Sequence, residues 1–181
     1  LTALLPVIRP LVSWLGFVLW FCLAGLGLVL GGLHWPDLTH DLLGQLTTPH
    51  SLVVLWLLFP LIKLFHELGH GFMTKAFGSE VHELGVMLLA FTPVPYCEAS
   101  AAWAFRDKWQ RVLVGAAGMM VEVALASLAL VVWINAEPGL VRLLAYNTIF
   151  LAGVSTVLFN LNPLLRFDGY YMLMDWVEIP N

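Results

Sequence analysis

Long apolar stretches divide this chain into blocks separated by short polar segments. The first block, from Leu11 to Leu33, has 23 residues and no charged side chain. At 1.5 Å per residue, a helix of that length measures about 34 Å, which exceeds the ~30 Å hydrocarbon core of a bilayer. The pattern therefore predicts a first membrane-spanning helix.

The second block is too short to span a membrane by itself. Ser51 is a candidate helix cap, and the purely apolar part after it, Leu52 to Ile62, has only 11 residues. A spanning helix requires the chain to stay helical through the sequence LFHELGH and on to about Phe77. Ionisable side chains would then lie inside a membrane helix.

The helical period is lost between Gly78 and Trp103. Leu84 to Phe91 is a short apolar run, and the TPVPY that follows contains two prolines, which exclude a regular helix. We expect strands or a re-entrant loop here. Backbone that is not helical is tolerated at membrane depth only where protein buries it or where it lines a wet cavity.

Two further apolar blocks complete the pattern, Val112 to Ile134 and Leu140 to Leu161, and Glu122 is the only charged residue inside the first of them. The expected fold is an all-α polytopic membrane protein with about four transmembrane helices and a short re-entrant β segment between the second and the third. Residues 1–181 form one membrane-embedded domain. Because the chain begins at Leu1 without a methionine, we expect it to be part of a longer protein.

Composition and charge agree with a membrane protein. Sixty per cent of the residues are hydrophobic and 11% are charged, against about 25% charged in soluble domains. The eight Lys and Arg form no long basic run, which argues against a nucleic-acid partner. Arg9, the segment RDKWQR (106–111) and Arg166 fall on one predicted side, and the acidic loop from His34 to His50 on the other. The positive-inside rule places both chain ends in the cytoplasm.

The sequence HELGH carries the candidate chemistry. Residues four apart share one face of a helix, so His66 and His70 can bind one metal ion while Glu67 lies beside them. That spacing is typical of a zinc site with an adjacent general base, and it indicates hydrolysis of an amide by zinc-activated water.

A chance match and a structural role are the alternatives. At this chain's residue frequencies, H-E-x-x-H arises by chance with a probability on the order of 1%. In a structural role, the histidines would be interfacial and Glu67 would pair with Lys63 on the same helix face. Ionisable groups inside a membrane are costly, however, and are usually functional.

A catalytic zinc ion needs a third protein ligand as well as an open position for water. The candidates are His82, Glu122 and Asp168, since His34, His40 and His50 fall in the loop on the far side. Glu122 is better explained by a structural partner such as Lys63 or a backbone amide. Asp168 follows a helix break at Pro163 and precedes Gly169, which permits close backbone approach.

HELGH followed by Asp168 in NLNPLLRFDG resembles the site-2 protease family of intramembrane zinc metalloproteases. Asn160, Pro163, Asp168 and Gly169 match the spacing of the family's second signature. The resemblance implies that His66, His70 and Asp168 bind Zn²⁺, that Glu67 is the catalytic base, and that Asn160 holds the substrate or the oxyanion. It also implies that Leu84 to Tyr96 presents the substrate as an added strand and that Gly115 to Glu122 is a small-residue patch of the next core helix.

One part of the second signature departs from the family. Leu164 to Phe167 stand where prolines are common, and Arg166 adds a charge near the proposed ligand. Together with FDGYYML and SAAWAFRDKW, this is similar to a branch of bacterial membrane peptidases associated with peptide export and efflux adaptor subunits. The implied location is the bacterial inner membrane, and the implied substrate is a membrane protein or peptide.

Two rival functions remain from the sequence. One is a zinc-binding subunit of an export or efflux complex with little or no proteolytic activity. Such a subunit needs no general base, so the presence of Glu67 favours the protease. The other is a transporter core with a coincidental motif, which binds no metal. Asn160 could also simply hydrogen-bond a neighbouring helix, and Gly115 and Gly118 are better explained by helix packing.

Overall fold

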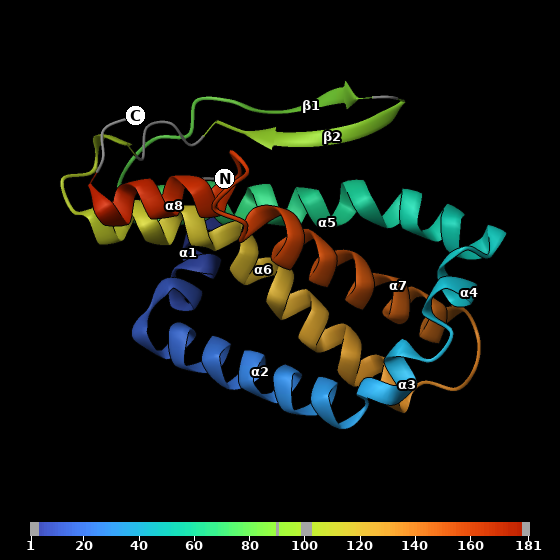
Figure 1. Cartoon of the computed structure of the whole chain (residues 1–181). Coiled ribbons are helices and arrows are strands. Elements are labelled where there is room, and N and C mark those ends of the chain that lie inside the picture. Colours follow the sequence, from blue (N-terminus) through green and yellow to red (C-terminus); the bar gives the residue numbers. More distant parts are fainter. Residues whose placement is uncertain (1–3, 90, 99–102, 179–181) are drawn as a thin grey trace.

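The structure, a computed structural model, describes residues 4–89, 91–98 and 103–178. Helices dominate it, and a two-stranded sheet interrupts them (Figure 1). In chain order the elements are α1 (Leu5–Ile8), η2 (Arg9–Val12), α2 (Trp14–Leu33), α3 (Trp35–Thr39), α4 (Leu42–Leu46), α5 (Pro49–Ala76), β1 (Leu84–Leu89), β2 (Thr92–Cys97), α6 (Lys108–Asn135), α7 (Leu140–Val154), η4 (Ser155–Asn160) and α8 (Asp168–Val177).

Four helices are long and apolar enough to cross a membrane, as expected: α2, α5, α6, and α7 continued by η4 to Asn160. The predicted start of α5 was wrong by three residues. Thr48 caps this helix by accepting a hydrogen bond from the Ser51 amide, and Pro49 occupies the first turn, where its missing N–H is not needed. Ser51 is fully buried inside the bundle instead.

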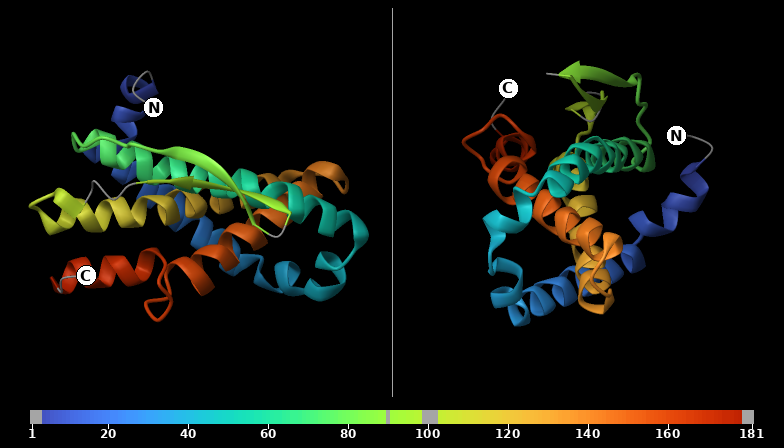
Figure 2. Two further views of the ribbon diagram at one scale, coloured as in Figure 1. Left: turned by 90° about the horizontal axis from the view of Figure 1, so that it is seen from above. Right: turned by 90° about the vertical axis from the view of Figure 1, so that its right-hand side faces the viewer.

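Helix α6 is the centre of the bundle. It packs against α2, α5, α7 and α8, and Figure 2 shows it running beneath α5 and between the other helices. Gly69 on α5 makes the closest approach possible, because a Cβ there would lie 2.8 Å from the carbonyl oxygen of Ala117. The indole of Trp20 ties α2 to α6 by donating to the Met120 carbonyl over 2.8 Å.

Polarity is distributed opposite to that of a soluble protein. The largest fully buried side chains in the described part of the chain are polar: Glu122, Asn147, Thr74 and Ser51. Large apolar side chains such as Trp14, Leu28 and Leu88 are mostly exposed on the outside. Polar residues that face the bundle interior, surrounded by an apolar exterior, are typical of helices that contact lipid.

The non-helical segment forms an antiparallel hairpin, which confirms strands. Leu84 pairs with Cys97, and Leu89 pairs with Thr92. The hairpin lies along α5, and β2 is the strand that contacts this helix (Figures 1 and 2). The last residue of β2, Cys97, thereby comes next to the HELGH turn of α5.

The two ends of the bundle differ in their connections. Helices α1 and α8 lie toward one end, and the short helices α3 and α4 lie toward the other (Figure 1). The loop expected between His34 and His50 therefore contains two helical turns of its own.

Candidate metal centre

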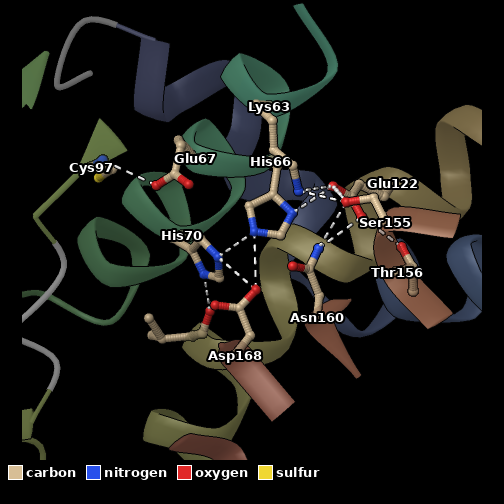
Figure 3. Close-up of polar contacts among 11 residues, drawn as sticks. Lys63, His66, Glu67, His70, Cys97, Glu122, Ser155, Thr156, Asn160 and Asp168 are labelled. Carbon is tan, nitrogen blue, oxygen red and sulfur yellow. Dashed lines mark hydrogen bonds and ion pairs between the residues drawn. The ribbon is translucent and has the colours of Figure 1, made fainter. Parts of the chain in front are cut away.

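Three side chains converge between α5 and α8. His66 and His70 are one turn apart on α5, and their Nε2 atoms are 3.0 Å apart. Asp168 is the first residue of α8, and its Oδ2 lies 3.0 Å from Nε2 of His66 and 3.5 Å from Nε2 of His70. These three ligand atoms all lie within 4.8 Å of one another (Figure 3).

The donor set fits a metal ion. Oδ2 of Asp168 is buried and, although it is close to both imidazoles, it makes no aligned hydrogen bond within the described residues. Oδ2 of Asp168 and the two Nε2 atoms are grouped closely enough to share one ion. Two imidazole nitrogens and one carboxylate oxygen suit a divalent transition metal, with room left for another ligand. His82 and Glu122 do not belong to this group.

His70 is oriented by the backbone of α6. Its Nδ1 lies 2.7 Å from the carbonyl oxygen of Val114. A carbonyl can only accept, so Nδ1 carries the proton and Nε2 keeps its lone pair for a metal. The side chain is therefore held as a ligand by a partner outside its own helix.

Gly118 lies against the two imidazoles from the α6 side. A Cβ at this position would lie 2.4 Å from Nε2 of His66 and 2.5 Å from Nε2 of His70. Gly118 therefore does more than allow the helices to pack closely. Its missing side chain leaves the space that the Nε2 atoms of His66 and His70 occupy. The sequence offered only a small-residue patch here, with no sign of which glycine faces the histidines.

A break after η4 brings Asp168 to the histidines. The side chain of Asn162 accepts from the Leu164 amide over 3.0 Å, which turns the chain at Pro163. Gly169 then packs against the backbone of the preceding segment, where a Cβ would lie 2.6 Å from the carbonyl oxygen of Asn160. The close approach expected at Gly169 is confirmed.

An ion pair fixes α8 on α6. Nε of Arg111 donates to Oδ1 of Asp175 over 2.7 Å, and a second Arg111 nitrogen donates to the carbonyl of Phe105. Two turns of helix separate Asp175 from Asp168, so this contact holds the helix that carries the third candidate ligand.

Glu67 lies on the open side of the histidines. Its Oε2 accepts from the Cys97 amide over 3.0 Å, so the end of β2 orients the carboxylate (Figure 3). Glu67, His70, Cys97 and Asp168 line one cavity of about 360 Å³. The alternative pairing of Glu67 with Lys63 is not what the structure shows, because Lys63 donates to Glu122.

The thiol of Cys97 is a poor nucleophile in this setting. Burial raises its pKa to about 11, and the neighbouring carboxylate of Glu67 acts in the same direction. It therefore stays protonated at neutral pH.

Glu122 lies on the closed side, completely buried. Its Oε1 accepts from Lys63 over 2.8 Å and from Ser155 over 3.1 Å. Its Oε2 accepts from Thr156 over 2.6 Å and from the Asn160 amide over 3.0 Å. The expected partner Lys63 is confirmed, whereas no sequence pattern indicated the two hydroxyl donors.

The π-helical turn η4 explains how three of these donors reach one carboxylate. The amide of Leu161 bonds the carbonyl of Thr156, five residues back, which widens the turn. Ser155, Thr156 and Asn160 then share the face that meets α6. Asn160 does not line the cavity beside Glu67, and its contact with Glu122 is the interhelical bond foreseen as an alternative; a role toward substrate stays a prediction.

No protein-family model, curated protein or solved structure matches this chain.

Proposed function

We propose that this chain is the core of an intramembrane zinc metalloprotease that resembles the site-2 protease family. One observation carries the proposal. The two histidines of HELGH and an aspartate 98 residues beyond His70 meet at one point, with Glu67 on the adjoining cavity wall. The proposed ligands and the proposed base thus come from two separate parts of the chain, α5 and the start of α8, and lie beside one cavity.

His66, His70 and Asp168 are the proposed zinc ligands. Zinc in such a site supplies Lewis acidity, which makes water a better nucleophile and polarises a peptide carbonyl. A coordination set of two histidines and one carboxylate leaves a position open, as catalytic zinc sites require.

Glu67 is the proposed general base. The Cys97 amide holds one of its carboxylate oxygens, which leaves the other to accept a proton from the attacking water. The same carboxyl then gives that proton to the leaving amine of the cleaved peptide. Its half-buried position at the cavity wall allows this exchange without a large movement of the side chain.

The surroundings of the site support cleavage at the membrane. We place the four apolar helices across a bilayer and the β1–β2 hairpin at membrane level beside α5. An extended substrate would then add as a strand to the hairpin and lead its peptide bond toward Glu67. The bacterial inner membrane is the location that the family branch implies.

The proposed orientation puts both ends of this chain in the cytoplasm. Lys75, Lys108 and Arg111 lie on elements at the α1 and α8 end, whereas Asp37 and Asp41 lie at the α3 and α4 end. This distribution follows the positive-inside rule. Water and the metal would reach the site from the cytoplasmic side.

The rival function is a zinc-binding subunit of an export or efflux complex. Such a subunit would bind zinc with the same three residues, but its function would not require Glu67 as a base. The test that distinguishes the protease from the export subunit uses wild-type protein, Asp168→Ala and Glu67→Gln, each purified in detergent. Zinc content and cleavage of a reporter transmembrane peptide are measured on the same samples.

If the chain is a zinc protease, we expect about one zinc per chain in the wild type and none in the Asp168 variant. We expect the Glu67 variant to keep its zinc and to cleave about 10²- to 10⁴-fold more slowly. Zinc without cleavage in the wild type would favour the export subunit, and a wild type that binds no zinc would contradict both functions.

A further inference from the structure

Glu122 is a buried carboxylate that the proposed reaction does not use. Its side chain has no exposed surface, and four donors from α5 and η4 contact it. Burying a charge is costly unless partners compensate it, and polar networks of this kind inside a membrane helix usually serve a function. The question is what the network supports.

The network reaches one of the proposed metal ligands. Oε1 of Glu122 lies 3.1 Å from Nδ1 of His66 (Figure 3). That nitrogen is buried and makes no aligned hydrogen bond within the described residues, so the Glu122 carboxylate is its close charged neighbour in the geometry of an ion pair. The other ring nitrogen of His66, Nε2, is the atom that lies beside Asp168.

His66 and His70 are therefore supported by different groups. His70 faces the neutral carbonyl of Val114, whereas His66 faces a carboxylate. Both groups keep Nδ1 protonated and so leave Nε2 free to bind an ion. Partners of this kind around metal ligands orient the ligands and strengthen metal binding.

We propose that Glu122 is the positioning residue of His66, which it holds in the tautomer and orientation that bind the metal. Lys63, Thr156 and Asn160 hold the carboxylate in turn, so Asn160 acts through Glu122. The inference rests on the proposed zinc site. It adds to that site a supporting residue on α6 for which the sequence predicted only a structural partner such as Lys63 or a backbone amide.

A purely structural ion pair between Lys63 and Glu122 is the competing explanation. In that case, loss of Glu122 would lower the stability of the bundle but would not change how the folded protein holds a metal. The affinity for zinc and the absorption spectrum of bound Co²⁺ distinguish the two, because both report on the ligands and not on folding.

The test compares three variants with the wild type, all purified in detergent. Glu122→Gln keeps the volume and removes the charge. The double variant Lys63→Met with Glu122→Gln removes both charges and so leaves no unpaired ammonium, which protects the fold if the single variant unfolds. Asn147→Leu is the control, because Asn147 is equally buried and, within the described residues, hydrogen-bonds only Ser51 and the carbonyl of Leu143. Thermal unfolding confirms that each variant is folded.

We expect both Glu122 variants to bind zinc about 10- to 100-fold more weakly in competition with a chelator. Their Co²⁺ spectra should also shift, whereas Asn147→Leu should match the wild type in both measurements. Folded Glu122 variants with wild-type zinc affinity and spectrum would overturn the positioning role and leave the protease proposal standing. A wild type that binds neither metal would overturn both.

Discussion

Two glutamates flank the same pair of imidazoles, and their surroundings are opposite. Glu122 is completely buried and accepts hydrogen bonds from four side chains. Glu67 lies on the other side, at the wall of a cavity, and its carboxylate accepts from one backbone amide (Figure 3). The same residue type thus occupies a closed side and an open side of the proposed metal centre.

The different surroundings of the two carboxylates suit them to different tasks. A group that moves protons must reach water and substrate, and Glu67 does so through the cavity. A group that orients a ligand must itself be fixed, as Glu122 is by the donors around it. Burial and the number of donors separate the two roles where residue type alone does not.

The largest expected loss of zinc affinity comes from filling the space between α6 and the two imidazoles. Gly118→Ala would place a Cβ 2.4 Å from Nε2 of His66. We expect zinc binding to fall by more than about 100-fold, because neither imidazole can keep its position. Alanine is the better helix former by about 1 kcal/mol, so the helix itself should not be weakened.

Zinc titration together with thermal unfolding checks this prediction. Gly153→Ala is the matched control, since a Cβ there meets nothing within 4 Å. Normal zinc affinity in a folded Gly118→Ala protein would show that the two imidazoles do not bind the ion from this face.

A smaller loss of zinc affinity is expected from weakening the contact between α6 and α8. Asp175→Asn weakens the Arg111 contact that holds α8, and therefore Asp168, against α6. A hydrogen bond between charged groups contributes about 1.5 to 3 kcal/mol to stability. Only part of this free energy is needed to position Asp168, so we expect zinc affinity to fall by about threefold to tenfold.

Glu178→Gln provides the comparison for that variant. It breaks a second α6–α8 ion pair, with Lys108, but Glu178 is mostly exposed and should contribute little. Equal zinc affinities for the two variants, measured by chelator competition, would mean that the Arg111 contact does not position Asp168.

The smallest effect concerns the electrostatics of the open side. Because burial and then Glu67 raise the pKa of Cys97 to about 11, its thiolate fraction should rise about tenfold per pH unit from pH 8 to 10. Alkylation by iodoacetamide, measured in a Cys22→Ser background, should follow that slope.

The two glutamates should differ in this assay. Glu67→Gln removes the nearby negative charge, lowers the pKa of the thiol and so moves the rate profile to lower pH. Glu122→Gln lies on the other side of the imidazoles and should leave the profile in place. A shift of equal size in both variants would contradict the separation into two sides.

Local patterns predicted a large part of the fold and of the site. Uninterrupted apolar stretches predicted the four long helices, and two prolines in TPVPY predicted non-helical backbone. The spacing of His66 and His70 placed both on one face of α5, and the second motif indicated Asp168, which the structure brings beside them. These features depend on residues close in sequence or on a matched motif.

Contacts between elements could not be predicted in this way. Which α6 residues face the histidines depends on the rotation of α6 against α5, so Gly118 could not be distinguished from Gly115. The bond from Cys97 to Glu67 depends on the strand register, and Ser155 and Thr156 reach Glu122 through the π-helical turn. No local periodicity encodes these arrangements.

X-ray absorption at the zinc edge of the purified wild-type protein tests the three proposed zinc ligands most directly. We expect nitrogen and oxygen neighbours at about 2.0 to 2.2 Å, outer scattering from two imidazoles, and no sulfur neighbour. Sulfur at about 2.3 Å, or fewer than two imidazoles around the bound zinc, would contradict the assignment of His66, His70 and Asp168 as its ligands.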